Sequence, residues 1–150
     1  MLLTFKNLNK LILITTLLCV KTISSENSPI KHITTSEIKK LTAIKSVWFF
    51  FKPNCPSCLL QVKNFSCLKD TQNIYSVGLS GSDKELWIES KKLQLKKHGI
   101  KHIYRGNKSL YETFSIDEKL SPQILFYENK TKIKKFIGVL PCQEILAFIN

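Results

Sequence analysis

The sequence predicts an α/β fold in which a central mixed β-sheet is flanked by helices on both faces. Residues 46–51 form an uninterrupted apolar and aromatic run, which is typical of a strand buried on both faces in the middle of a sheet. Helical and strand patterns alternate along residues 36–99, which implies parallel strands joined by helical crossovers. Near the C-terminus, two apolar runs flank Asn129 and Lys130, as in an antiparallel hairpin.

Local signals place the elements in order along the chain. Thr34 and Glu37 form a capping-box pattern at the start of a short first helix, and Gly99 ends a longer one. Pro122 opens the hairpin, and Pro141 lies in the first turn of the last helix. The expected strands are 46–51, 74–79, 100–104, 123–127 and 133–139, and the expected helices begin near 34 and 55 and then cover 84–97, 109–114 and 141–148.

The N-terminus has the pattern of a signal peptide. Lys6 and Lys10 precede an apolar run of about ten residues, which Lys21 and small polar residues follow. Such a run is too short to cross about 30 Å of hydrocarbon as a helix, so a permanent anchor is the weaker alternative, as is a lipoprotein acylated at Cys19. We therefore expect a signal peptide at 1–24, a leader segment at 25–35 and one domain at 36–150.

The composition is that of an ordinary globular domain, with 43% hydrophobic and 23% charged residues. This excludes wholesale disorder and a multi-span membrane protein. The formal net charge is +12, but the lysines are scattered in pairs such as Lys91-Lys92 and Lys134-Lys135 rather than gathered on one helix. We expect a solvated basic surface and no nucleic-acid partner.

The strongest chemical signal is Cys55-Pro56-Ser57-Cys58, directly after the buried strand and at the start of a helix. A dithiol catalyst needs one acidic, accessible thiol and a second thiol close enough to resolve the mixed disulfide. Unpaired amides and the helix dipole favour the thiolate at the helix start, so Cys55 is the expected nucleophile and Cys58 the resolving thiol. Together they are the expected redox-active disulfide.

Two other uses of the pair are less favoured. A zinc site would need two more ligands, and the chain has no second Cys-x-x-Cys and no histidine at ligand-like spacing, so we expect no metal. An inert disulfide staple remains open, although the strand before the pair and the helix after it favour chemistry.

At this point the sequence resembles the thioredoxin superfamily, in particular the exported thiol:disulfide interchange proteins of the bacterial cell envelope. The likeness lies in residues 47–58, in residues 120–127 and in Ile137-Gly138. The resemblance implies a thioredoxin fold and a cis Pro122 beside the cysteines. It also implies that the backbone of Ser121 pairs with an extended substrate segment and that Gly138 lines the substrate groove.

Two positions depart from the family pattern. Phe49 stands where thioredoxins have a buried acid, and Gln61 stands where the cytochrome-c-maturation relatives have a glutamate. Both acids assist proton transfer from the resolving thiol in the family, so their absence argues against efficient turnover as a reductase. Cys67 and Cys142 could form a bridge, but we expect two buried free thiols because the last helix should start at the active-site end of the sheet.

The sequence therefore predicts an exported thiol:disulfide oxidoreductase without a bound cofactor. Its partners would be cysteine-containing protein substrates and a redox partner protein. It would lie in the periplasm or cell envelope of a bacterium, and a membrane-anchored or secreted protein is the alternative. Membrane contact is expected only through an uncleaved signal or a lipid anchor. The alternatives are a thioredoxin-fold binding module or copper-handling protein that uses the same thiols, and a small structural protein stapled by the pair.

Overall fold

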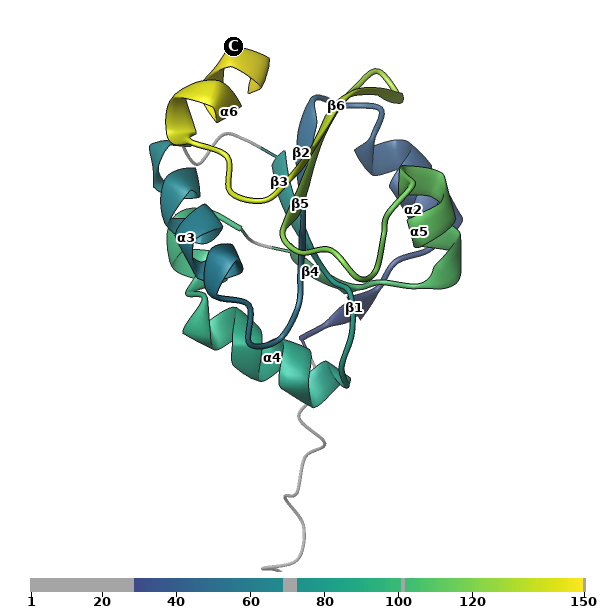
Figure 1. The fold of residues 1–150 in the computed structure, drawn as a ribbon. Helices are drawn as coiled ribbons and strands as arrows, with labels where there is room; N and C mark the ends of the chain where they lie inside the picture. The colour runs from purple at the N-terminus through teal and green to yellow at the C-terminus, as the bar shows by residue number, and fades with distance from the viewer. Residues whose placement is uncertain (1–28, 69–72, 101, 150) are drawn as a thin grey trace, which may run out of the picture.

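The computed structural model describes residues 29–68, 73–100 and 102–149 (Figure 1). The predicted signal peptide, residues 1–24, lies outside the described residues, as do residues 25–28 of the predicted leader. Among the described residues, no helix has the length and apolar character needed to span a membrane.

The described residues contain six strands, five α-helices and two short 3₁₀ helices. In chain order these are β1 (Lys31–His32), α2 (Thr35–Leu41), β2 (Ser46–Phe51), α3 (Pro56–Asn64), η1 (Phe65–Cys67), β3 (Asn73–Gly78), α4 (Asp83–Lys92), η2 (Leu95–His98), β4 (His102–Arg105), α5 (Lys108–Phe114), β5 (Gln123–Glu128), β6 (Thr131–Ile137) and α6 (Cys142–Ile149).

The strands form one mixed sheet in the order β1-β4-β3-β2-β5-β6. Strands β1, β4, β3 and β2 run parallel, and β5 pairs with β2 in antiparallel fashion. The β5–β6 hairpin turns at Asn129 and Lys130, which both have positive φ, as a tight turn of this type requires. The predicted mixed sheet is therefore confirmed, with β2 in its interior.

Helices cover both faces of the sheet, as predicted: α3, α4 and α6 lie on one side and α2 and α5 on the other (Figure 1). Successive residues of β2 point to opposite faces, so Phe49 and Phe51 enter one core while Trp48 and Phe50 enter the other. All four aromatic side chains are fully buried. The continuous apolar run was thus the signature of a strand with a core on each face.

The structure differs from the predicted elements in two places. Strand β1 lies within the segment predicted as a leader, where a two-residue strand has too little pattern to be detected, although Ile30 and Ile33 on either side are buried. The helix predicted over 84–97 is broken at Gln94, which adopts the left-handed conformation. This break lets Leu93 and Leu95 both enter the same core, whereas a continuous helix would turn them about 200° apart.

The expectation of free thiols at Cys67 and Cys142 is wrong, because these residues form a disulfide. The prediction assumed that the last helix starts near Cys55. Instead, residues 138–141 carry the chain away from β6 and along α3, where Asn64 Nδ2 donates a hydrogen bond of 3.0 Å to the carbonyl of Leu140. Helix α6 therefore begins beside the end of α3 (Figure 1), within reach of Cys67.

Candidate active site

Cys55 and Cys58 form a disulfide at the start of α3, with an S–S distance of 2.12 Å. Cys55 is the N-cap residue, Pro56 opens the helix, and the amide of Cys58 donates a hydrogen bond of 3.1 Å to Cys55 Sγ. An amide in the first turn of a helix that points at a sulfur stabilises negative charge there. Cys55 is half-buried and Cys58 is fully buried, so the outer sulfur is the one that another molecule can reach.

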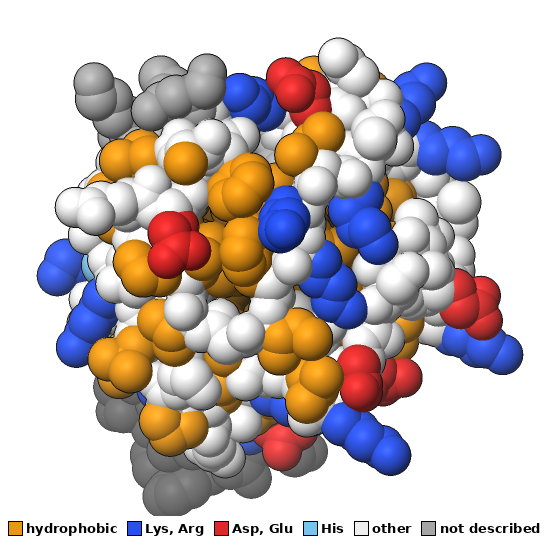
Figure 2. Space-filling view, turned by 45° about the horizontal axis from the view of Figure 1, so that its top comes forward, with side chains coloured by type: hydrophobic (Ala, Val, Ile, Leu, Met, Phe, Trp, Pro, Cys, Tyr) orange, Lys and Arg blue, Asp and Glu red, His pale blue; other side chains and the backbone are white. Residues whose placement is uncertain are grey.

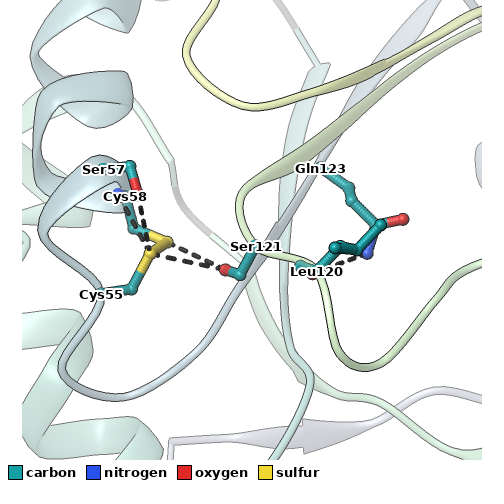
Figure 3. Close-up of a disulfide and its surroundings, with 6 residues drawn as sticks. All are labelled: Cys55, Ser57, Cys58, Leu120, Ser121 and Gln123. Atoms are coloured by element: carbon teal, nitrogen blue, oxygen red, sulfur yellow. Dashed lines mark hydrogen bonds between the residues drawn. A yellow bond between two sulfur atoms is a disulfide. The ribbon is translucent and has the colours of Figure 1, made fainter.

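The loop that precedes β5 brings a second element to the disulfide. The Ser121–Pro122 peptide bond is cis, as expected. The hydroxyl of Ser121 lies 3.1 Å from Cys58 Sγ and 3.5 Å from Cys55 Sγ, so it faces both sulfurs (Figure 3). The fold thus brings together two segments that lie more than sixty residues apart in the chain.

Gly138 completes the group of predicted site residues. Its amide donates a hydrogen bond of 2.9 Å to the carbonyl of Pro122, which ties the end of β6 to the cis-proline loop. Its φ of +97° favours glycine, and a Cβ placed there would meet no atom within 4 Å. The surface beside Pro122 is therefore open at this point.

The side chain of Gln123 stabilises the loop that contains the cis proline. This side chain is fully buried, and its Nε2 donates a hydrogen bond of 2.7 Å to the carbonyl of Asp117. The same Nε2 donates one of 2.8 Å to the carbonyl of Leu120 (Figure 3). The sequence analysis missed this role. The available signal was a lone amide at the start of an otherwise apolar strand.

Exposed apolar side chains neighbour each part of the site. Two of these side chains lie on α3 just after Cys58, a third belongs to the residue before Ser121, and the last two belong to the residues on either side of Gly138. These five residues, which we call the apolar rim, are Leu59, Leu60, Leu120, Ile137 and Val139. Leu59 and Leu60 are 40% and 55% exposed although they belong to a helix that packs on the sheet. Such a group of exposed apolar side chains is typical of a surface that contacts other polypeptides.

Searches with the sequence match no protein-family model and no curated protein. Solved structures are similar in fold. Among them, StoA from Bacillus subtilis is 17% identical with a TM-score of 0.56, over 72% of this chain and 84% of its own. A secreted disulfide oxidoreductase of Mycobacterium tuberculosis, homologous to DsbE of Escherichia coli, is 13% identical with a TM-score of 0.58, over 73% of this chain and 83% of its own. The exposed lipoprotein thioredoxin of Streptococcus pneumoniae is 17% identical with a TM-score of 0.54, over 75% of this chain and 87% of its own.

The chain has the thioredoxin fold. In this fold the two departures from the family pattern lie beside the cysteines. Phe49 is packed edge-on against Phe65 and stacked on Phe51 in the core, which leaves no room for a charged group. Gln61 is fully buried, and its Oε1 accepts a hydrogen bond of 2.6 Å from the amide of Leu140.

Gln61 therefore has a structural use in this version of the thioredoxin fold. It ties α3 to the segment that leads into α6, while its Nε2 has no hydrogen-bond partner among the described residues. An amide neither takes up nor releases a proton near neutral pH, so Gln61 does not replace the missing acid.

The described part of the thioredoxin fold holds no cluster of three or more histidine, cysteine, aspartate or glutamate side chains that could bind a metal ion. A hollow does lie beside Cys55, and Glu89 of α4 forms part of its wall. The sequence analysis did not single out Glu89. Its spacing from Leu86 and Leu93 on the inner face of a helix was the available signal.

Proposed function

We propose that this chain is an exported thiol:disulfide oxidoreductase that exchanges disulfides with cysteine-containing protein substrates. The observation that supports this most is the placement of the Cys55–Cys58 disulfide at a helix start, with the Ser121 hydroxyl beside both sulfurs. A structural staple needs neither the exposed outer sulfur nor a cis-proline loop against the pair.

In the reducing direction, the Cys55 thiolate attacks one sulfur of a substrate disulfide. The substrate S–S bond breaks, one substrate thiolate leaves, and Cys55 is joined to the other in a mixed disulfide. The Cys58 thiolate then attacks Cys55 Sγ, which releases the second substrate thiol and forms the Cys55–Cys58 disulfide. The substrate gains two electrons and two protons, and the dithiol loses them; the reverse sequence oxidises a substrate dithiol.

Residues around the pair support these steps. The Cys58 amide, at 3.1 Å from Cys55 Sγ, stabilises the attacking or departing thiolate. The Ser121 hydroxyl, at 3.1 Å from Cys58 Sγ, can donate to a thiolate at that position. Because Phe49 and Gln61 provide no carboxylate, we propose that the departing substrate thiolate takes the proton of Cys58.

The surface supports a polypeptide substrate. We propose that the backbone at Ser121 pairs with an extended substrate segment and that Pro122 and Gly138 line the groove, while the apolar rim contacts apolar substrate side chains. On the face in Figure 2, which brings the top of Figure 1 forward, basic side chains are spread out with acidic ones between several of them. Export rests on the N-terminal pattern and on structural relatives described as secreted or as an exposed lipoprotein.

Trapping tests the exchange step. With Cys58→Ala, Cys55 has no resolving thiol, so the protein expressed in a bacterial envelope should accumulate mixed disulfides that disappear on reduction. The matched Cys55→Ala variant keeps one thiol of the pair but should trap far less, because Cys58 is buried. Equal trapping by both variants, or none by either, would contradict the assignment.

The reduction potential of the Cys55–Cys58 pair decides whether the protein reduces or oxidises its substrates. Equilibration of the mature protein in glutathione or dithiothreitol buffers, with quantified thiol trapping, measures it directly. A value of about −270 mV would indicate a reductase, and one of about −120 mV would indicate an oxidase or an isomerase. A pair that does not equilibrate at all would instead indicate a binding module or a staple.

A further inference from the structure

An open hollow of about 410 Å³ lies directly beside Cys55, between the start of α3 and the end of α4. Cys55, Pro56 and Leu59 line it from the side of α3. Glu89, Lys92 and Leu93 line it from the side of α4. Its size is within the range of ligand-binding pockets. Because Cys55 is part of its wall, whatever occupies the hollow lies next to the reacting sulfur.

Glu89 is unusual among the residues of this wall. Its side chain is only 7% exposed, and its one partner among the described residues is Lys92, whose Nζ lies 3.6 Å from Glu89 Oε2. A carboxylate can accept about four hydrogen bonds, so one long ion pair leaves acceptor positions on Glu89 that a ligand in the hollow can use. Lys92 is 59% exposed, so its ammonium remains hydrated and is free to move away.

We propose that this hollow is a substrate subsite that binds a cationic side chain, arginine or lysine, next to the reacting cysteine of the substrate. The proposal rests on the function proposed above and gives it a sequence preference. A guanidinium matches a carboxylate with two parallel hydrogen bonds and would supply the donors that Glu89 lacks. The aliphatic stem of the same side chain would pack against the apolar wall at Leu59 and Leu93.

An acidic substrate side chain fits the hollow less well. It would approach the poorly solvated carboxylate of Glu89, and like charges in such a place repel strongly. The one positively charged side chain in the wall of the hollow is that of Lys92, which is mostly exposed and hydrated, so an ion pair with it would contribute little. The preference for a cation also runs against the net charge of +12, so long-range attraction would not produce it.

A chromogenic reaction tests this preference. The Cys58→Ala protein has a single attacking thiol in the pair, and its thiolate displaces thionitrobenzoate from a peptide whose cysteine is joined to that group. The Cys55–peptide disulfide forms, and the released coloured thiolate is measured. Three peptides differ only in the residues that flank cysteine: arginine, norleucine or glutamate.

We expect the arginine peptide to react at least about tenfold faster than the norleucine peptide, the range expected for a charge-assisted hydrogen bond, and the glutamate peptide to be the slowest. When Glu89→Gln is added to the Cys58→Ala protein, the ratio of the arginine-peptide rate to the norleucine-peptide rate should fall close to one. The matched Glu112→Gln variant loses the same charge from an exposed position on α5 and should keep the full ratio.

The two proposals fail in different ways. If neither the peptides nor a small aromatic disulfide react with Cys55 faster than with free cysteine, the exchange function itself is wrong. If all three peptides react quickly and equally, or the glutamate peptide is preferred, only the subsite is wrong. If Glu89→Gln does not fold, Lys92→Ala can be used instead, because it keeps the carboxylate and removes the competing cation. A higher ratio of the arginine-peptide rate to the norleucine-peptide rate then supports the subsite. An unchanged or lower ratio overturns it.

Discussion

Loss of the Cys67–Cys142 disulfide is expected to destabilise the protein far more than loss of the Cys55–Cys58 disulfide. The first closes a loop with a sequence separation of 75, and the second closes one with a separation of 3. In the chain-entropy description, the stabilisation grows with the logarithm of the loop length. It gives about 4.5 kcal/mol for the long loop and about 1.7 kcal/mol for the short one, a difference of about 3 kcal/mol.

Urea unfolding measures this difference. The double variants Cys67→Ala/Cys142→Ala and Cys55→Ala/Cys58→Ala are each compared with the oxidised wild-type protein. With a denaturant slope of about 1.5 kcal/mol per molar, the first variant should unfold about 3 M earlier and the second about 1 M earlier. Circular dichroism before denaturant is added checks that both variants are folded. A loss for the first variant equal to or smaller than that for the second would refute the entropic reasoning.

Three further predictions concern single side chains. Gln123→Leu removes the two hydrogen bonds that the Gln123 side chain donates to loop carbonyls and the longer one that it accepts from the amide of Asp117. It should therefore cost about 1–3 kcal/mol in urea unfolding and slow exchange at Cys55, whereas a loop that did not depend on Gln123 would change neither. Gly138→Ala should cost about 1–2 kcal/mol from its φ of +97° without any clash, and an unchanged unfolding midpoint would contradict this. The hydrogen bond from Arg105 holds the pKa of Asp83 below its ordinary 3.8, so its stabilisation is present above that ordinary value and is lost as the pH falls through the lower folded-state pKa. In urea unfolding, Asp83→Asn should be less stable than wild type at about pH 6, and the difference should shrink as the pH is lowered below 3.8; a difference that does not change with pH would contradict this.

Local patterns in the sequence were sufficient for most of the fold. The run at residues 46–51 is apolar at every position, and only a strand with a core on each face can bury all of it. The capping boxes at Thr34 and Ser82 satisfy helix amides within four residues, so the helix starts could be predicted without any tertiary information. The Asn129-Lys130 turn is equally local.

Parts of the site could be predicted for the same reason. A cysteine pair that follows a buried strand and opens a helix is a local arrangement, and so is a proline that opens a strand. That the Pro122 loop lies beside the cysteines came only from the family resemblance, and that the Ser121 hydroxyl faces both sulfurs came only from the structure. Nothing in residues 55–58 alone determines which loop packs against them.

The sequence by itself determined the order of most elements, the buried central strand and the position of the Cys55–Cys58 pair at a helix start, because each depends on residues close together in the chain. Only the tertiary structure decided that Cys67 pairs with Cys142, that Gln123 holds the cis-proline loop, and that Glu89 lies in the wall beside Cys55. Each of these contacts depends on where a whole helix or loop comes to lie. That position is decided by the burial of side chains in both cores together, which no short segment encodes.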